Sequence, residues 1–421
     1  MKVFKYIDGN PAVVAAVDVG TSKICTLIGR SQGEGIEILG IGLSASQGIR
    51  KGKVVNVERT TLAIRDSLAL AMEVARREPN VIVAGVSGDA ISSFNIENEV
   101  LISRASREIT EREMEKVVES SRSRIPGEQI RIIHLIPQSF SVDDQHGIAD
   151  PQGMVGSSLG ARIHVVTAQE SHIQNLHKCF LDSGLEVANF IFQPYACAQS
   201  VLTSVEKEAG TLLVDIGGGT TDMAMFFDGS IWFSGVIPLG GEHLTADLSV
   251  GLRTSRDEAE KIKLKYGSVF SKLVSPDEMI EVKDMSLSSL KTIRRKFACE
   301  IIEARIKELF LLLRRQIKAS GMERYLRGGV VLTGGSSLLE GINDFASTML
   351  DLPVRGGYPD GRQYIGMVQT ISNPIFSTAC GLLEQALSAK GSRKKTRPFI
   401  ESSFGRAQKM FDWLRDFFMM G

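Results

Sequence analysis

The stretch that decides the fold is TLLVDIGGGTTDMAMFF, residues 211–227. Its apolar runs, 211–214 and 223–227, have the length and composition of β-strands, and a polar turn rich in glycine, threonine and aspartate joins them. The same pattern occurs much earlier, at VVAAVDVGTSKICTLI, residues 13–28. Asp18 and Asp215 therefore take equivalent positions in two similar parts of the chain.

One recurrence at nearly half the length of a 421-residue chain predicts two similar lobes rather than a solenoid of short repeats. A chain of this length is also too long for one compact core. Because ligand sites favour concave surfaces between domains, we expect the ligand to bind between the lobes.

The two turns contain the residue types that bind phosphate groups and a metal ion. Small residues let backbone amides approach an anion closely, and hydroxyl groups add further donors. Asp18 and Asp215 would hold a hydrated Mg²⁺, and Lys23 would reach a phosphate as a point charge. The other residues expected at the phosphates are Gly20, Thr21, Ser22, Gly217, Gly218, Gly219, Thr220 and Thr221.

The alternative for each turn is an ordinary hairpin, in which aspartate and glycine are the commonest residues. Two matched copies favour the phosphate site, whereas a single lysine in a turn, such as Lys23, is more often simply exposed. Another glycine pair, followed by a serine, comes after the apolar run 330–332. Gly334, Gly335 and Ser336 would lie against an adenine or a ribose, although one such element is a weak signal.

Composition excludes several classes of protein. The 49 basic and 49 acidic residues give a net charge of zero, so no global field would recruit nucleic acid. The five cysteines are odd in number and scattered, which predicts reduced thiols in a cytosol rather than a disulfide framework or a zinc site. No stretch reaches about 18 uncharged apolar residues, so we expect neither secretion nor a membrane-spanning helix.

Capping residues and apolar periodicity predict three helical regions. Thr110 and Ser255 each precede a glutamate by three residues, as in a capping box, and would begin helices over 110–124 and 255–267. The stretch 288–320 keeps apolar residues at helical spacing and stops at Gly321. We expect this stretch to hold two helices.

The order of these motifs resembles that of the actin, sugar-kinase and heat-shock-chaperone superfamily. The segments QPYA (193–196) and STACG (377–381) look like its two inter-lobe connections, so both lobes are covered. The resemblance implies an α/β fold of the actin type, with two lobes around a cleft that binds ATP and Mg²⁺. An actin-like ATPase fold is therefore expected.

Within that superfamily the chain most resembles the FtsA family of bacterial cell-division proteins, nearly end to end. The block 84–166 looks like the extra α+β subdomain inserted in the first lobe of that family. The implied units are the first-lobe core (1–83 and 167–198), the inserted subdomain (84–166), the second-lobe core (199–238 and 303–389), the outer second-lobe subdomain (239–302), a basic linker (390–403) and an amphipathic membrane helix (404–421).

The resemblance also assigns roles to residues outside the two turns. Gly241, Glu260 and Lys263 look like the position where such ATPases hold adenosine, although a Glu and a Lys three apart are more often a surface pair worth about 0.2–0.5 kcal/mol. Gln193 stands where a glutamate often polarises the attacking water. A neutral amide orients water but cannot take its proton, so with Gln193 as the catalytic candidate we expect weak or absent ATP hydrolysis.

The last segment predicts an amphipathic helix that lies on a membrane. Residues 404–421 place their apolar side chains on one helical face, but the segment is too short and too charged to span a bilayer. The basic linker before it would favour anionic lipid by about 1 kcal/mol per charge; docking of the helix on the protein body is the alternative. The membrane-facing residues are Phe404, Met410, Phe411, Trp413, Leu414, Phe417 and Phe418.

The FtsA resemblance implies a role in septum formation during the cell cycle. Such a protein would polymerise into protofilaments at the cytoplasmic face of the inner membrane. It would bind the C-terminal tail of the tubulin-like protein FtsZ near residues 240–290, and later division proteins through the inserted subdomain. The alternatives are a pilus-assembly adaptor of the same branch, or a small-molecule kinase, which would need an aspartate base that no motif assigns.

Overall fold

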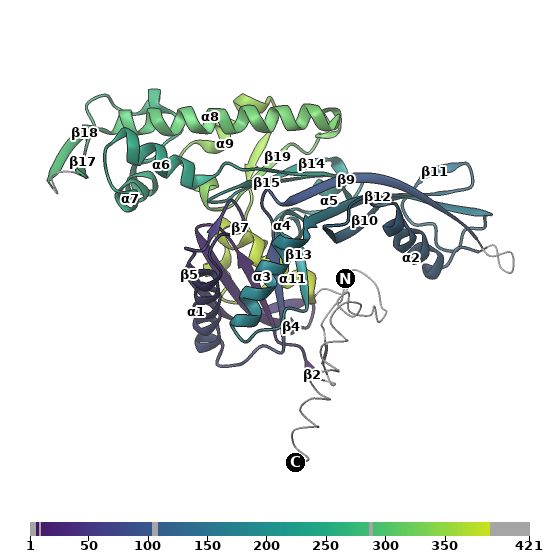
Figure 1. The fold of residues 1–421 in the computed structure, drawn as a ribbon. Helices are drawn as coiled ribbons and strands as arrows, with labels where there is room; N and C mark the ends of the chain where they lie inside the picture. The colour runs from purple at the N-terminus through teal and green to yellow at the C-terminus, as the bar shows by residue number, and fades with distance from the viewer. Residues whose placement is uncertain (1–5, 8–9, 103–107, 286–288, 388–421) are drawn as a thin grey trace, which may run out of the picture.

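The computed structural model describes residues 6–7, 10–102, 108–285 and 289–387. Within these ranges the chain forms two lobes, each built on a mixed β-sheet, and a third sheet that projects to one side (Figure 1). The first lobe lies below the second in this view, and the long helix α8 (Arg295–Ser320) runs along the outer edge of the second.

The first lobe is built on a six-stranded sheet in the order β13-β8-β3-β4-β5-β21. Alternate residues of a strand point to opposite faces. Ala15 and Val17 therefore pack with helices α1 and α3, whereas Val14 and Ala16 pack with α11. The elements are β3 (Val14–Val19), β4 (Lys23–Gln32), β5 (Gly35–Ala45), β8 (Val81–Val86), β13 (Asn189–Phe192), β21 (Tyr364–Gly366), α1 (Val57–Ala75), α3 (Glu170–Asp182) and α11 (Ser377–Leu387).

The second lobe has a five-stranded sheet in the order β16-β15-β14-β19-β20. One face is buried under α6 to α9, and the other packs against α4, where Leu213 and Ala224 meet Ala198 and Val201. The elements are β14 (Thr211–Ile216), β15 (Thr221–Phe227), β16 (Ser230–Ile237), β19 (Val330–Thr333), β20 (Val354–Gly356), α4 (Gln193–Val201), α6 (Gly241–Gly251), α7 (Arg256–Tyr266) and α9 (Ile342–Leu350).

The two sheets confirm the predicted repeat. Each contains three antiparallel strands followed by two parallel ones, and the hairpins β3–β4 and β14–β15 occupy the same place. The first sheet has β21 in addition, parallel to β5 at its other edge. Their registers also correspond, because Asp18 stands opposite Cys25 and Asp215 stands opposite Asp222. The actin-type α/β fold expected from the sequence is therefore the fold of this chain.

The helices α4 and α11 cross each other between the lobes. Gly381 of α11 lies so close to α4 that a β-carbon there would overlap the carbonyl group of Ala196. Small residues allow this approach. The two helices begin beside Asp18 and Asp215, α4 at Gln193 and α11 at Ser377. The small-residue segments quoted above thus lie at the crossing.

The third sheet has the order β11-β10-β12-β9 and its own apolar core with α2 (Glu111–Ser120). It also contacts the second lobe, where Asn95 Nδ2 donates to Trp232 O at 3.0 Å and His164 Nε2 lies 2.9 Å from Ser234 Oγ. It contacts the first lobe as well, where Arg131 Nε of β10 donates to Glu170 Oε2 of α3 at 3.0 Å. Its strands are β9 (Ile91–Leu101), β10 (Ile130–Val142), β11 (Gln145–Ile148) and β12 (Ser158–Gln169).

Two of the helical predictions are confirmed and the third is wrong. α2 follows the Thr110 cap and continues as a 3-10 turn to Arg124, and α7 runs from the Ser255 cap to Gly267. The stretch 288–320 instead contains strand β18 (Leu290–Arg294), paired with β17 (Met279–Lys283), and then the single helix α8. Residues 295–320 contain neither glycine nor proline, so nothing interrupts α8.

All five cysteines are free and buried, as expected of reduced core thiols. Among the described residues, no helix is both long and apolar enough to cross a membrane. The short elements are β1 (Tyr6–Ile7), β2 (Asn10–Pro11), β6 (Ile49–Arg50), β7 (Lys53–Val54), α5 (Ser204–Ala209), α10 (Val368–Ile371), η1 (Ser121–Arg124), η2 (Ser271–Leu273), η3 (Glu323–Tyr325), η4 (Gly335–Leu338), η5 (Gly361–Gln363) and η6 (Pro374–Phe376).

Candidate functional site

The glycine-rich turns of the two hairpins meet between the lobes. A side chain on Gly218 would overlap the hydroxyl of Ser22, and a β-carbon on Gly219 would lie 2.5 Å from Thr21 Oγ1. Glycine at these positions therefore lets the turn of the second lobe lie directly against the turn of the first. The structure brings the predicted phosphate-binding residues of both hairpins to one place.

Each turn is closed by its own backbone. Gly20 N donates to Lys23 O at 3.0 Å, and Gly217 N donates to Thr220 O at 3.0 Å. The start of α6 is fastened to the second turn, because Gly241 N donates to Gly217 O at 2.9 Å. Gly241, which the family resemblance assigned to the adenosine side, is thus fixed next to the glycine-rich turn of the second lobe.

Three carboxyl groups gather behind the turns, on β3, β14 and β15. Asp18 and Asp222 are buried, and Asp215 is partly exposed. Burial raises the pKa of Asp18 to about 6, and the nearby charge of Asp215 adds to that rise while Lys23 opposes it. Burial likewise raises the pKa of Asp222 to about 7, and raises that of Asp215. The folded protein therefore holds its carboxylates here at a cost in solvation free energy.

Hydrogen-bond donors from distant parts of the chain orient these carboxylates. Gln193 Nε2 donates to Asp18 Oδ1 at 2.9 Å, and Thr378 Oγ1 donates to Asp215 Oδ2 at 2.9 Å. These donors are at the starts of α4 and α11. Gln193, the predicted catalytic candidate, is therefore in direct contact with a predicted metal-binding carboxylate.

Sequence reasoning missed three residues of this cluster: Asp222, Ser87 and Thr378. Ser87 donates to Asp222 Oδ1, and Thr220 Oγ1 donates to Asp222 Oδ2 at 3.0 Å. Asp222 was visible in the sequence, because the turn begins and ends with aspartate and hairpin register places these two residues opposite each other. No comparable signal marks Ser87, which lies 135 residues from its partner.

The predicted adenosine-side residues also come together. Lys263 is buried, and its Nζ donates to Gly241 O at 3.2 Å and to Glu260 Oε2 at 2.7 Å. Lys263 is therefore not a solvated surface residue, whereas the Glu260 side chain is 42% exposed. Ser336 Oγ donates to Gly217 O at 3.4 Å, which joins the Gly334-Gly335-Ser336 element to the same turn.

Gly334 lies against Asp215 of the acid cluster. Its φ is +85°, and a β-carbon there would overlap Asp215 Oδ1. Gly335 is more open, since the nearest atom to its β-carbon position is Ile375 Cγ2 at 3.7 Å. Lys23 is not simply exposed: its ammonium group donates to Ile375 O and lies 5.5 Å from the centre of the Phe376 ring.

The residue types gathered at the two turns fit a magnesium–nucleotide complex. No ion pair among the described residues includes Asp18, Asp215 or Asp222, so a cation would offset their burial. Within the described ranges, no three carboxylate, imidazole or thiol groups converge closely enough to bind a metal alone. Mg²⁺ suits such a site, because it keeps several waters and takes further ligands from phosphate.

The structure does not test the predicted membrane segment. The linker 390–403 and the residues Phe404 to Phe418 lie outside the described residues.

Two family models match the chain. The model described as "Cell division protein FtsA" matches residues 212–381. The model described as "SHS2 domain inserted in FTSA" matches residues 88–167, which contain strands β9 to β11 and most of β12.

The known proteins similar to this chain agree with the family models. The chain is 38% identical over 377 residues to the cell division protein FtsA of Pseudomonas aeruginosa, with 89% of each chain covered. It is 37% identical over 382 residues to the FtsA of Neisseria meningitidis, covering 90% of this chain and 91% of that protein. Its identity to the FtsA of Bacillus subtilis is 32% over 378 residues, covering 90% and 84%.

Solved structures share the fold at much lower sequence identity. The PilM-PilN type IV pilus biogenesis complex matches with a TM-score of 0.62 at 16% identity, over 89% of this chain and 98% of that one. MreB5 of Spiroplasma citri bound to ADP matches with a TM-score of 0.52 at 13% identity, over 88% and 94%. At these identities the likeness shows the fold alone. The sequence matches to the FtsA proteins extend over most of both chains, and the family models include the inserted domain. The chain therefore belongs to the FtsA family of actin-like cell-division proteins.

Proposed function

We propose that this chain binds ATP with Mg²⁺ between its lobes and acts as a membrane-attached, polymerising protein of bacterial cell division. The observation that carries the nucleotide proposal is the pair of glycine-rich turns beside three carboxyl groups that have no ion-pair partner within the described part of the chain. Bound Mg²⁺ would neutralise charge on the phosphates and on Asp18, Asp215 and Asp222. The ADP-bound MreB5 structure, which has the same fold, is consistent with a nucleotide in this cleft.

Replacement of Asp215 by alanine tests the nucleotide site. The variant would lose a carboxylate whose geometry Thr378 fixes, so we expect Mg²⁺-dependent ATP binding to be abolished in equilibrium titrations with a fluorescent ATP analogue. Asp66→Ala, at an exposed position of α1, is the matched control and should bind like the wild type. Unchanged affinity of Asp215→Ala in the presence of Mg²⁺ would remove the proposal.

The adenosine side would be formed by Gly241, Glu260, Lys263 and the element 334–336. Lys263 would act mainly by holding Glu260 and the start of α6 in place, because its three donors already have partners. Gln193 would orient a water molecule without accepting its proton. Hydrolysis is therefore expected to be slow or absent.

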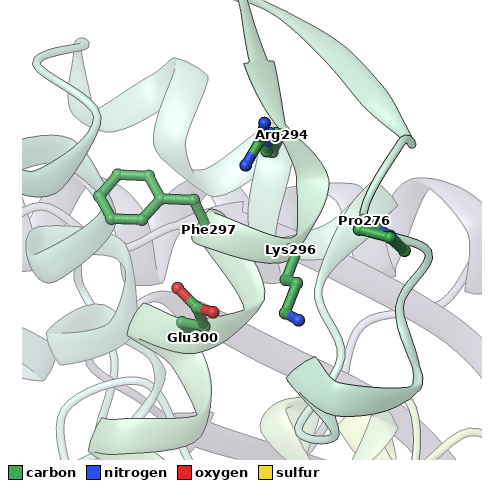
Figure 2. A pocket seen from close by; sticks show the side chains of 5 residues that line it. All are labelled: Pro276, Arg294, Lys296, Phe297 and Glu300. Atoms are coloured by element: carbon green, nitrogen blue, oxygen red, sulfur yellow. The ribbon is translucent and has the colours of Figure 1, made fainter.

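We further propose that the C-terminal tail of FtsZ binds at the start of α8. A pocket of about 500 Å³ there is lined by residues from β18, α8 and the loop before β17 (Figure 2). Arg294 and Lys296 give it positive charge, and the Phe297 side chain is 46% exposed. A peptide with both acidic and apolar side chains fits this lining. Pro276 lies within the stretch 240–290 that the FtsA resemblance implied, and the other lining residues follow just after it. Its lining residues are Pro276, Arg294, Lys296, Phe297 and Glu300.

Charge reversal tests the tail site. Arg294→Glu is expected to weaken binding of a labelled FtsZ tail peptide at least tenfold in fluorescence anisotropy. Arg315→Glu, at an exposed position further along the same helix, is the control. Equal peptide affinity of the two variants would place the tail elsewhere.

Membrane attachment would come from the amphipathic segment 404–421 and the basic linker before it. One such helix gives reversible binding, and several helices on one polymer multiply avidity without a new contact. The full chain should therefore sediment with anionic liposomes, more so with ATP, whereas a chain ending at Ser403 should not. Equal sedimentation of both chains would make the last segment a structural helix and leave the tether unsupported.

We also propose that the chain divides into the subdomains that the FtsA resemblance implies. Later division proteins would bind to the inserted subdomain. The protein would then act at the septum, on the cytoplasmic face of the inner membrane, and link FtsZ polymers to it. The pilus-adaptor alternative loses support, because the chain is only 16% identical to the PilM-PilN structure and 38% identical to an FtsA protein.

A further inference from the structure

A histidine of the inserted sheet reaches the strand that leads into Gln193. His134 lies on β10, and its Nε2 accepts a hydrogen bond from the backbone N–H of Phe192 at 3.0 Å. Phe192 is the last residue of β13 and the residue immediately before α4. The contact therefore joins the inserted sheet to the residue that directly precedes Gln193.

A β-bulge directs His134 to this place. In the pairing of β10 with β12, Ile132 stands opposite Thr167 and His134 stands opposite Val166, so Ile133 is an extra residue. The inserted residue turns His134 to the face that residue 133 would otherwise occupy, because side chains alternate along a strand. Bulges commonly re-aim side chains in this way beside functional sites.

The chemistry of the contact requires a neutral imidazole. Nε2 can accept a hydrogen bond only when it carries no proton, so the ring proton must be on Nδ1. Burial lowers the pKa of His134 to about 3. The acceptor is therefore present at every physiological pH.

The same ring also contacts α4 beyond Gln193. The centres of the His134 and Tyr195 rings lie 5.3 Å apart, with 54° between the ring planes. His134 thus contacts the chain on both sides of Gln193. On its other side Gln193 lies against β8, where a β-carbon on Gly85 would be 2.9 Å from Gln193 Cγ.

We propose that His134 is a positioning residue for the nucleotide site: it fixes the backbone of residues 192–195 so that Gln193 holds Asp18. His134 itself touches no nucleotide and acts through Gln193, whose amide donates to Asp18 Oδ1 at 2.9 Å. The inserted sheet, with its own core, is in this way linked to the cleft. This inference rests on the proposed binding of Mg²⁺–ATP between the lobes.

Three substitutions at one position separate positioning from packing. His134→Leu keeps the bulk and removes the acceptor. His134→Gln places an amide oxygen where Nε2 was, and His134→Asn carries an amide too short to reach Phe192. His146→Leu, an exposed histidine on β11 of the same sheet, is the matched control.

Amide exchange of the ligand-free protein reports the contact directly. In exchange mass spectrometry, the peptide covering residues 189–195 should lose protection by at least tenfold in His134→Leu and His134→Asn. His134→Gln and His146→Leu should keep it. Unchanged protection in both the Leu and Asn variants would overturn the inference, and the Asn variant preserves the test if the Leu variant does not fold.

The affinity for Mg²⁺–ATP measures how the loss of this contact affects the nucleotide site. Loss of one neutral hydrogen bond should raise the Kd for Mg²⁺–ATP roughly three- to tenfold in His134→Leu, with recovery in His134→Gln. In a Gln193→Ala background, the same substitution at His134 should have no further effect. An equal effect in both backgrounds, or an unchanged Kd, would show that His134 does not act through Gln193.

The two proposals fail in different ways. If the wild-type protein binds no Mg²⁺–ATP, the proposed function fails, and exchange in the ligand-free protein alone then decides whether His134 positions residues 192–195. If the wild type binds and His134→Leu binds equally well, the nucleotide site stands and the positioning role falls.

Discussion

Replacing Asp222 by asparagine should make the ligand-free protein more stable and a poorer binder of Mg²⁺–ATP. Asp222 is 6% exposed and has no basic partner among the described residues; its contacts are the hydroxyls of Ser87 and Thr220. Its ionised form is therefore unfavourable in the folded state, and a neutral amide removes that penalty. The same change removes negative charge from the proposed Mg²⁺ site.

The size of the effect follows from the pKa. Burial raises the pKa of Asp222 from 3.8 to about 7. Between pH 3.8 and about pH 7, Asp222 is ionised in the unfolded chain but protonated in the folded chain. This carboxyl therefore lowers the free energy of unfolding as pH rises, and the penalty reaches its full size above about pH 7. At about 1.4 kcal/mol for each tenfold change in proton affinity, the penalty at pH 8 is roughly 4 kcal/mol. An asparagine amide cannot accept from both hydroxyls, so we expect a gain of roughly 2–4 kcal/mol.

Urea unfolding without nucleotide, at pH 4 and at pH 8, measures this gain. Asp222→Asn should exceed the wild type in free energy of unfolding at pH 8, and the difference should shrink towards zero at pH 4. Asp228→Asn, at an exposed position with φ of 51° in the turn between β15 and β16, should stay within about 0.5 kcal/mol of wild type at both pH values.

Two results would refute this reasoning. If Asp222→Asn were no more stable than wild type at pH 8, or equally stabilised at pH 4, Asp222 would not be a carboxyl with a raised pKa. If the variant gained stability but bound Mg²⁺–ATP with unchanged affinity, the charge of Asp222 would not serve the nucleotide site.

Three further outcomes are expected. Gly334→Ala should lose roughly 1–3 kcal/mol in urea unfolding and weaken Mg²⁺–ATP binding, because φ is +85° and the new methyl overlaps Asp215; an unchanged unfolding midpoint would contradict this. Burial lowers the pKa of His164 to about 4, so its contribution to stability should be lost as pH falls from 6.5 towards 4, and His164→Gln should lack that loss; parallel pH profiles of both proteins would exclude it. In a Trp413→Phe background, Mg²⁺–ATP should change the emission of Trp232, whose ring and carbonyl contact the inserted sheet; a constant spectrum at saturating ATP would show that this contact does not respond to the nucleotide.

Much of the fold could be predicted from the sequence because its signals are local. An aspartate–glycine turn between two apolar runs specifies a hairpin, and its recurrence specified two lobes. Capping residues likewise predicted where α2 and α7 begin. The prediction for the stretch 288–320 was wrong because it also relied on a local signal. Residues 290–294 fit a helical period, but backbone pairing with β17 makes them strand β18.

The sequence by itself determined the hairpins, the repeat and the residues that line the two turns, because each depends on neighbours along the chain. Only the tertiary structure decided the rest of the site. Ser87 and Asp222 lie 135 residues apart, and Phe192 and His134 lie 58 apart. Burial removes water from these groups, and it is this loss of solvation that raises the pKa of Asp222 and lowers that of His134. No local pattern encodes how much solvent a folded chain will exclude from a side chain.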